Sequence, residues 1–161
     1  MFSMDRTVLK TPLGALEIVG SQKGIRSVTF TENPDDYDAG ETPESLKECK
    51  RQLLSYFDGK LREFSIMLDP EGTPFQRKVW AQLLSIGYGS TTSYTEQTRA
   101  LGDLKAIRAV AGANAKNPIA IIIPCHRVVG ADGKLTGYAG GLWRKRWLLE
   151  HENPPSQTSL F

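Results

Sequence analysis

The chain has 161 residues, 40% of them hydrophobic and 24% charged, which suits one medium-sized or two small globular domains. The N-terminal residues contain no apolar run, and no stretch approaches the ~18 consecutive apolar residues of a membrane span. We therefore expect neither a secretory signal nor a membrane anchor. The two cysteines, Cys49 and Cys125, are then expected to be reduced thiols in the cytoplasm.

The formal net charge of +2 conceals an uneven distribution along the chain. Residues 1–73 carry nine basic and thirteen acidic side chains, whereas residues 74–161 carry eleven basic and five acidic ones. A basic second part favours contact with a polyanion such as nucleic acid. A chance asymmetry on a solvated surface would give the same counts, so charge alone leaves both interpretations open.

Only four residues of the types that bind structural zinc are present: Cys49, Cys125, His126 and His151. A closed structural zinc site requires four Cys or His ligands. Such a site would consume the whole set, including the adjacent Cys-His pair. We therefore expect no metal.

The first part of the chain has the pattern of a small sheet followed by a helix. Residues 7–30 alternate between apolar and polar side chains around turn signals, which predicts an antiparallel meander of about three strands. Residues 31–43 are polar and are expected to form a loop. From Glu44 the apolar spacing becomes helical, and Asp58-Gly59 ends that helix. We expect one further strand over residues 64–68 and a domain boundary in the linker 69–74.

The second part opens with a well-signalled helix. Thr73 is its expected N-cap, Pro74 is at the first helical position, and Gln76 completes a capping box. One face of this helix is apolar, with Phe75, Val79, Leu83 and Ile86. Residues 87–89 are expected to end it.

Two short helices are expected next. Ser93 and Glu96 form another capping box, which begins a helix that runs to Leu101. Gly102 makes a tight turn, and Asp103 caps a second helix of about residues 104–116. This arrangement is typical of a helix-turn-helix, although many helix pairs outside DNA-binding proteins share it.

The second helix of this pair has two different faces. Leu104, Ile107 and Ala111 share one face and are expected to pack inward. The opposite face is small, smooth and flanked by cations, with Arg108 at its edge; it comprises Lys105, Ala109, Gly112, Ala113 and Lys116. Such a face suits close contact with a backbone partner whose phosphates the lysines reach. The alternative is an alanine-rich helix packed on both sides.

The apolar run 119–123 is expected to be buried, so that Cys125 and His126 follow directly after a segment of the core. An imidazole within reach of a thiol can take its proton and increase the nucleophilic thiolate fraction. Adjacent residues do not always touch, so a buried structural cysteine beside a satisfied histidine is the alternative. A final amphipathic helix is expected from Leu142 to about Glu152.

The motif Pro124-Cys125-His126-Arg127-Val128 resembles the active-site motif of the O6-alkylguanine-DNA alkyltransferases, the methylated-DNA–protein-cysteine methyltransferases. The resemblance extends from about Thr73 to Glu152, and more weakly back through residues 54–59. It includes residues 74–76, 93–94, 106–110, 117–118, 121–123, 137–141 and 147–152. The elements and the resemblance together predict an α+β fold: a sheet-plus-helix domain over 1–72, a mainly helical domain with the helix-turn-helix over 73–152, and a tail over 153–161.

The resemblance implies a role for each site residue. Cys125 would attack the alkyl carbon on guanine O6, and His126, acting through a water and oriented by Glu152, would be the base. Asn117 would hold the active-site turn, and Tyr94 would donate to guanine N3 as charge builds on the leaving base. The carbonyls of Cys125 and Val128, the amide of Ala139 and the ring of Tyr138 would form the guanine pocket.

The resemblance also implies how DNA is bound. The target base must rotate out of the duplex, and Arg108 would fill the space that it leaves. The helix bearing Arg108 would lie in the minor groove of double-stranded DNA, with Arg127 and the small face of that helix among the contacts. No cofactor is expected, because the DNA itself is the alkyl donor. The protein is expected to be a monomer.

The thioether product would be stable, so each molecule is expected to react once. A non-enzymatic DNA-binding or regulatory module and a cysteine hydrolase that turns over are the alternatives. Relatives differ at Asn114 and Gly137, which are expected to tune the tolerated alkyl size. Outside the resemblance, Gln157–Phe161 resembles the peptide by which bacterial repair proteins bind the DNA sliding clamp. The alternative to clamp binding is that these residues fold back onto the domain or fray.

Overall fold

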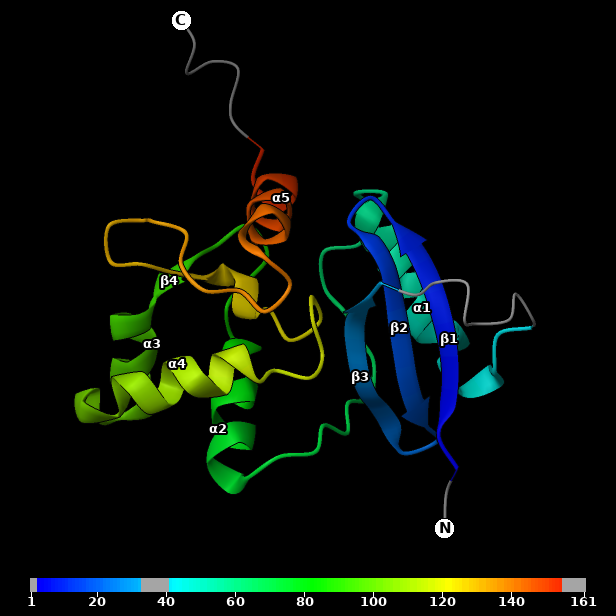
Figure 1. Cartoon of the computed structure of the whole chain (residues 1–161), viewed down its shortest axis with the longest axis horizontal. Helices are drawn as coiled ribbons and strands as arrows, with labels where there is room; N and C mark the ends of the chain where they lie inside the picture. Colours follow the sequence, from blue (N-terminus) through cyan, green and yellow to red (C-terminus); the bar gives the residue numbers. More distant parts are fainter. Residues whose placement is uncertain (1–2, 33–40, 155–161) are drawn as a thin grey trace, which may run out of the picture. The chain divides into compact units, whose positions relative to one another are not determined.

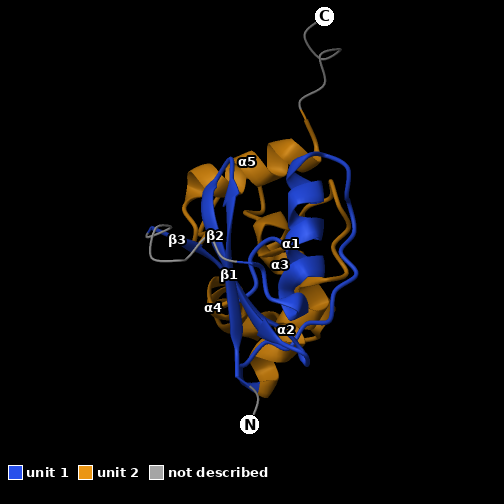
Figure 2. Cartoon of the chain, turned by 90° about the vertical axis from the view of Figure 1, so that its right-hand side faces the viewer, with its two compact units in different colours: residues 1–73, 118–122 blue, residues 74–117, 123–161 orange. Residues whose placement is uncertain are grey.

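The computed structural model describes residues 3–32 and 41–154 (Figure 1). The chain divides into two compact units, residues 1–73 with 118–122 and residues 74–117 with 123–161 (Figure 2). The predicted α+β class is confirmed: sheet and helix build the first unit, and helices dominate the second. Most of the predicted loop 31–43 and the tail peptide Gln157–Phe161 lie outside the described residues. No helix in the described ranges is long and apolar enough to cross a membrane.

The first unit is built on an antiparallel sheet in the order β1 (Asp5–Thr11), β2 (Gly14–Ser21) and β3 (Gly24–Thr31), as the alternating pattern predicted. Leu9 is paired with Leu16, and Ile18 is paired with Val28, so these buried side chains share one face of the sheet. The helix α1 (Glu44–Phe57) contacts the sheet, and Leu46 and Leu53 on it are fully buried (Figure 1).

The outer edge of β3 is covered by two short extended segments. Ile25 donates to the Met67 carbonyl at 2.9 Å and accepts from the Asp69 amide at 2.8 Å. Val28 donates to the Pro118 carbonyl and accepts from the Ala120 amide, both at 2.9 Å, which explains why residues 118–122 belong to this unit. Covering an edge in this way removes a template for unwanted pairing with another chain.

The predicted strand over residues 64–68 is wrong. Only Leu68 forms a bridge with the sheet, opposite Ile25. The backbone of Ser65 bonds instead to the side chain of Gln52 on α1, which accepts from the Ser65 amide at 3.0 Å and donates to its carbonyl at 3.3 Å. The side chain of Gln52 thus makes the backbone hydrogen bonds that a neighbouring strand was expected to make.

Within the described residues, the second unit contains the α-helices α2 (Pro74–Leu83), α3 (Tyr94–Leu101), α4 (Ile107–Ala115) and α5 (Leu142–Glu152). The predicted caps of the helix pair are confirmed, because Ser93 accepts from the Glu96 amide and Asp103 accepts from the Lys105 amide, each at 3.0 Å. The predicted single helix over 104–116 begins as a short 3-10 turn, η2 (Leu104–Ala106), and continues as α4.

A two-stranded parallel sheet, β4 (Thr92–Ser93) with β5 (Val128–Val129), was not anticipated from the sequence. Strands of two residues carry too little apolar alternation to be recognised by pattern. This pairing ties the start of α3 to the chain just after the 3-10 turn η3 (Cys125–Arg127). It therefore links the segment that bears Tyr94 to the segment that bears Cys125.

The predicted inward face of η2 and α4 is wrong at Leu104, which is 49% exposed. Ile107 and Ala111, the other two residues of that face, are half-buried, and the fully buried residues of α4 are Val110, Ala113 and Asn114. Trp80 of α2 donates its indole N–H to the Ala113 carbonyl at 2.9 Å, and Asn114 exchanges two 2.8 Å hydrogen bonds with Gln97 of α3. The neighbouring helices thus select a face that includes a polar side chain, which a count of apolar residues cannot identify.

Candidate active site

Cys125 lies at the end of a buried apolar segment. Ile119, Ile121, Ile122 and Ile123 are at most 5% exposed, as predicted for this run. Ile121 has a φ of 73°, a left-handed conformation that is strained for a β-branched residue. The chain then turns through η3, where His126 and Arg127 are buried but Cys125 is partly exposed. Cys125 is therefore the one residue of η3 that is not fully buried.

Asn117 contacts both ends of this turn. Its side-chain amide nitrogen donates to the Ile123 carbonyl at 2.8 Å and lies 3.3 Å from the Cys125 sulfur. The first bond holds the backbone that precedes η3. The second places a donor on the sulfur, where it favours the thiolate over the thiol.

Behind the thiol, His126 and Arg127 share one carboxylate. The His126 Nε2 atom lies 2.7 Å from Oε2 of Glu152, and Arg127 donates to both carboxylate oxygens, at 2.7 Å and 3.1 Å. A further nitrogen of Arg127 donates to the Ile86 carbonyl at 2.5 Å. The side chain of Glu152 is 1% exposed, so these bonds lie in a low-dielectric interior, where they are strong.

The prediction that Arg127 contacts DNA is wrong. The residue is 6% exposed, and its guanidinium is committed to Glu152 and Ile86. A buried guanidinium requires an anionic partner, and the carboxylate that sequence analysis assigned to His126 alone supplies it. Arg127 therefore positions Glu152 within the protein.

The ionisation of this cluster follows from its burial and its charges. Burial raises the pKa of Glu152, but hydrogen bonds from His126 and Arg127, together with the charge of Arg127, outweigh it and bring the pKa to about 2. Burial lowers the pKa of His126 by more than the Glu152 carboxylate raises it. His126 is then neutral at about pH 7, with its proton on the Nε2 that faces the carboxylate. Its buried Nδ1 has no hydrogen-bond partner within the described part of the chain, so it is available to accept a proton.

Lys145 is a functional candidate that sequence analysis did not identify. It is fully buried on α5 and donates to the carbonyls of Thr136 and Gly137, at 2.7 Å and 3.3 Å. Burial lowers the pKa of Lys145 to about 8, while the nearby charge of Cys125 raises it. The signal was its spacing from Leu148 and Glu152, which puts all three residues on one helix face.

The resting state of Cys125 is the thiol. Burial raises its pKa, and the Asn117 hydrogen bond and the Lys145 charge oppose that rise without overcoming it. Because the donor and the cation only partly offset the burial, release of the thiol proton requires a base. The adjacent neutral imidazole of His126 is the base that can take it.

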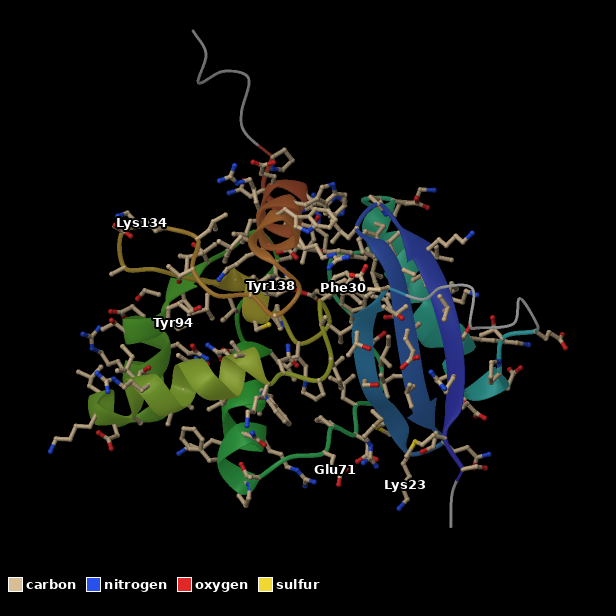
Figure 3. All side chains as sticks on the ribbon, viewed as in Figure 1. Lys23, Phe30, Glu71, Tyr94, Lys134 and Tyr138 are labelled. Carbon is tan, nitrogen blue, oxygen red and sulfur yellow. The ribbon has the colours of Figure 1, made fainter. Side chains whose placement is uncertain are left out.

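One tyrosine, Tyr138, lies in the loop that follows β5, and another, Tyr94, contacts that loop (Figure 3). The Tyr94 hydroxyl donates to the Thr136 carbonyl at 3.3 Å, so it contacts the same carbonyl as Lys145. The Tyr138 hydroxyl is buried without a hydrogen-bond partner among the described residues, and burial raises its pKa well above the usual value. It therefore remains a neutral donor. Ala139, the next residue, is exposed.

The predicted small face of the second helix is largely exposed. Lys105, Arg108, Ala109, Gly112 and Lys116 are all accessible, and a Cβ atom added at Gly112 would meet nothing within 4 Å. Ala113 is the exception: it is 4% exposed and packs inward beside Trp80, so its predicted contact with DNA is wrong. The remaining residues form a smooth basic surface on η2 and α4.

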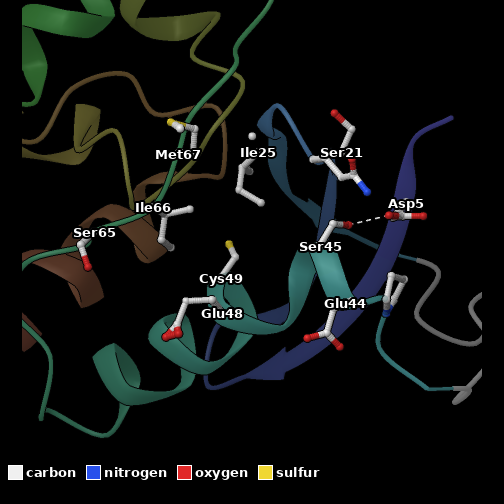
Figure 4. A pocket seen from close by; sticks show the side chains of 13 residues that line it. Asp5, Ser21, Ile25, Glu44, Ser45, Glu48, Cys49, Ser65, Ile66 and Met67 are labelled. Carbon is white, nitrogen blue, oxygen red and sulfur yellow. Dashed lines mark hydrogen bonds between the residues drawn. The ribbon is translucent and has the colours of Figure 1, made fainter. Parts of the chain in front are cut away.

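Cys49 provides a contrast with Cys125. It is 1% exposed on α1, and burial raises the pKa of its thiol to about 12, so it is not a nucleophile. It borders a hollow of the first unit, where Ser45 donates to Asp5 at 2.5 Å (Figure 4). Cys125 is thus the one cysteine whose surroundings support chemistry.

Comparisons with known proteins identify the family. Residues 74–154 match the family described as "6-O-methylguanine DNA methyltransferase, DNA binding domain", and residues 4–70 match its "ribonuclease-like domain". A methylated-DNA–protein-cysteine methyltransferase of Methanosarcina acetivorans is 46% identical over 155 residues, which cover 92% of this chain and 98% of that protein.

Solved structures give the same result. The O6-methylguanine methyltransferase of Mycobacterium tuberculosis matches with a TM-score of 0.81 and 42% identity over 99% of each chain. The OGT protein of that organism in complex with DNA matches with a TM-score of 0.80 and 46% identity over 90% of each chain. Since both halves of the chain match the same family and the match extends over nearly its whole length, the chain belongs to the 6-O-methylguanine DNA methyltransferase family.

Proposed function

We propose that this protein repairs DNA directly, by transferring an alkyl group from O6 of guanine to the sulfur of Cys125. The observation that carries the proposal is a partly exposed Cys125 with an Asn117 donor on its sulfur, followed in the chain by a neutral His126 whose Nε2 is held by Glu152. Nucleophile, base and orienting carboxylate are the three groups that activation of a thiol requires.

The reaction forms one bond and breaks one. The Cys125 proton passes through a water to Nδ1 of His126, and the carboxylate of Glu152 stabilises the imidazolium that results. The sulfur displaces guanine from the alkyl carbon, so the S–C bond forms as the C–O6 bond breaks. The electron pair of that bond stays on the guanine, and Tyr94 donates a hydrogen bond to N3 as the charge develops.

The guanine would lie beside the loop that carries Tyr138 and Ala139. The Tyr138 ring forms a wall, the exposed Ala139 supplies an amide donor to O6, and the carbonyls of Cys125 and Val128 accept from the exocyclic amine. That last pair would select guanine over adenine, because adenine has no amino group at the same position.

Double-stranded DNA is the partner that fits the surface on η2 and α4. Arg108 is exposed on it and would enter the base stack when the target nucleotide rotates out. Lys105 and Lys116 flank the small residues Ala109 and Gly112, which allows a close approach of the helix to the minor groove with phosphate contacts on both sides. Little dependence on DNA sequence is expected.

The thioether on Cys125 is uncharged and has a poor leaving group, so water does not regenerate the thiol. One molecule therefore repairs one lesion, without a cofactor. We propose that it acts as a monomer in the cytoplasm, where reducing conditions keep both free cysteines reduced.

The test is intact-protein mass spectrometry after incubation with duplex DNA that carries O6-methylguanine. The expected result is one added methyl group that maps to Cys125. Cys49→Ser should react normally as the matched control, and Cys125→Ser should not react. DNA binding without any mass change would instead indicate a non-enzymatic DNA-binding module, and turnover beyond one equivalent would indicate a hydrolase.

We also propose that the tail segment Gln157–Phe161 binds the bacterial sliding clamp. Its glutamine-led sequence ends in Leu160-Phe161, and the support is this sequence alone. The affinity for the clamp should fall when the chain is truncated after Pro155 or when both final residues are changed to alanine. Equal affinity of the full-length and truncated proteins would contradict the proposal.

A further inference from the structure

A groove whose lining does not include Cys125 lies between the loop that follows β5 and the start of α5. Its volume is about 700 Å³, and it is lined by Gly133, Lys134, Leu135, Leu142, Trp143 and Arg146. Neither the reaction proposed above nor the basic surface on η2 and α4 uses any of these side chains. The groove therefore has no assigned role.

The groove exposes an aromatic ring that its surroundings hold in place. Trp143 is 56% exposed and Leu142 is 48% exposed, which is unusual for adjacent large apolar residues. The guanidinium of Arg144 lies 4.7 Å from the centre of the indole and donates to the Gly140 carbonyl at 2.9 Å. Gly141, whose φ is 95°, leaves room for the ring, because a Cβ atom there would lie 3.4 Å from it. The Arg144 guanidinium, itself hydrogen-bonded, restrains the indole, which reduces the entropy that a ligand must offset.

The charge around this platform is positive. Lys134 and Arg146 line the groove, which contains no carboxylate among its lining residues. Lys134 lies at the outer end of the loop and is 78% exposed, with a loose 3.5 Å pair to Asp132 (Figure 3). An anionic ligand with a flat apolar part is complementary to this combination.

We propose that this groove binds an unpaired nucleotide of single-stranded DNA, with its base stacked on Trp143 and its phosphates near Arg146 and Lys134. Exposed aromatic rings flanked by cations are the physical basis of single-strand binding, because every base offers a π face and every nucleotide a phosphate. A paired base is already stacked on both sides, so intact duplex cannot use the indole in this way. The volume suits one nucleotide, since ligand sites commonly measure about 300–1,000 Å³.

The inference rests on the proposed function only in that DNA is the partner. The groove offers the protein a second contact with DNA, on strands opened near a lesion. Its loop also carries Tyr138 and the carbonyls that Lys145 contacts, so a nucleotide bound here would lie beside the segment that borders the reacting base.

The experiment measures binding of the full-length protein to a labelled oligothymidylate of about eight nucleotides and to an undamaged duplex of about sixteen base pairs. Trp143→Leu should weaken oligothymidylate binding about tenfold or more, because it retains apolar area but removes the π face. Trp143→Phe should restore most of the affinity. Duplex affinity should change by less than about twofold in both variants.

Arg146→Gln should lower the slope of log affinity against log salt for the oligothymidylate by about 0.7, the value for one phosphate on a single strand. Lys60→Gln, which removes an exposed lysine from the first unit, is the matched control and should not change it. Thermal unfolding midpoints equal to wild type establish that each variant is folded.

Unchanged oligothymidylate binding by Trp143→Leu overturns the proposal, as does a wild-type protein that does not bind the probe. An equal loss of affinity for duplex and single strand also overturns it, because the groove would then contact duplex phosphates. Methyl transfer to Cys125, measured separately by mass, distinguishes failure of this inference from failure of the proposed function.

Discussion

Replacing Glu152 by glutamine tests the centre of the proposed site. The carboxylate accepts from His126 at 2.7 Å and from Arg127 at 2.7 Å and 3.1 Å, and its side chain is 1% exposed. Glutamine conserves the shape but is neutral, and its amide nitrogen cannot accept. Either His126 or Arg127 then faces the amide nitrogen of the glutamine, which is another donor. The buried guanidinium of Arg127 also loses its counter-charge.

The magnitude can be derived in two ways. Removing one partner of a buried ion pair destabilises proteins by about 3–5 kcal/mol. The pKa of Glu152 is lowered from 4.5 to about 2 in the folded protein, which corresponds to about 3 kcal/mol by linkage. Because the folded-state pKa is depressed, this stability is fully present above about pH 4.5 and is lost as pH falls through about 2. The difference in the free energy of unfolding between wild type and the Glu152→Gln variant should therefore become smaller as the pH falls from about 4.5 to about 2.

Urea unfolding measures the free energy of unfolding across this pH range. The single-turnover rate with free O6-benzylguanine measures the effect on the alkyl transfer. We expect the rate to fall by about 10²–10⁴, the usual contribution of general base catalysis, because His126 loses the group that orients it. Glu150→Gln, an exposed change on the same helix, is the matched control and should alter neither quantity. A Glu152→Gln protein within about 1 kcal/mol of wild type at neutral pH would refute the buried ion-pair reasoning.

Four other substitutions test the basic surface, the buried cation and the corrected helix face. Arg108→Ala should impair repair of duplex DNA far more than reaction with free O6-benzylguanine; equal losses on both substrates would exclude it as the residue that enters the stack. Lys105→Ala should lower the salt slope of duplex binding by about one, and an unchanged slope would remove it from the phosphate contacts. Lys145→Met should raise the pKa of the reactive thiol and shift the pH–rate profile to higher pH, and an unshifted profile would contradict its electrostatic role. Ala113→Leu should destabilise the protein by about 1–3 kcal/mol, because it overpacks a buried position. Ala109→Leu, on the exposed face of the helix, is the control and should not destabilise it. Equal free energies of unfolding for the two variants would contradict the assignment of the buried face.

Local signals determined much of this fold. The three strands, the helix that begins at Glu44, and the caps at Ser93 and Asp103 all depend on residues within a few positions of each other, so they can be predicted from the sequence. The buried run that ends before Cys125 belongs to the same class, since five consecutive apolar residues have few alternatives to the core.

Part of the site could also be predicted. Similarity to a known family identified Cys125, His126, Glu152 and Asn117, and the structure brings these four residues together around η3. Lys145 was missed although its spacing places it on the face of Leu148 and Glu152, because a lysine on a helix is usually solvated and packing shows that this one is buried. Arg127 was assigned to DNA for the same reason: its carboxylate partner is 25 residues away.

The sequence by itself therefore determined the local elements and the identity of the nucleophile, because short-range hydrogen bonds and apolar periodicity are encoded within single segments. Only the tertiary structure decided which face of α4 is buried, where residues 64–68 and 118–122 find their hydrogen bonds, and which buried charges share Glu152. These outcomes depend on partners distant in the chain. The free energy of burying a polar group is set by the partner that it meets, and the sequence around that group does not specify which partner this is.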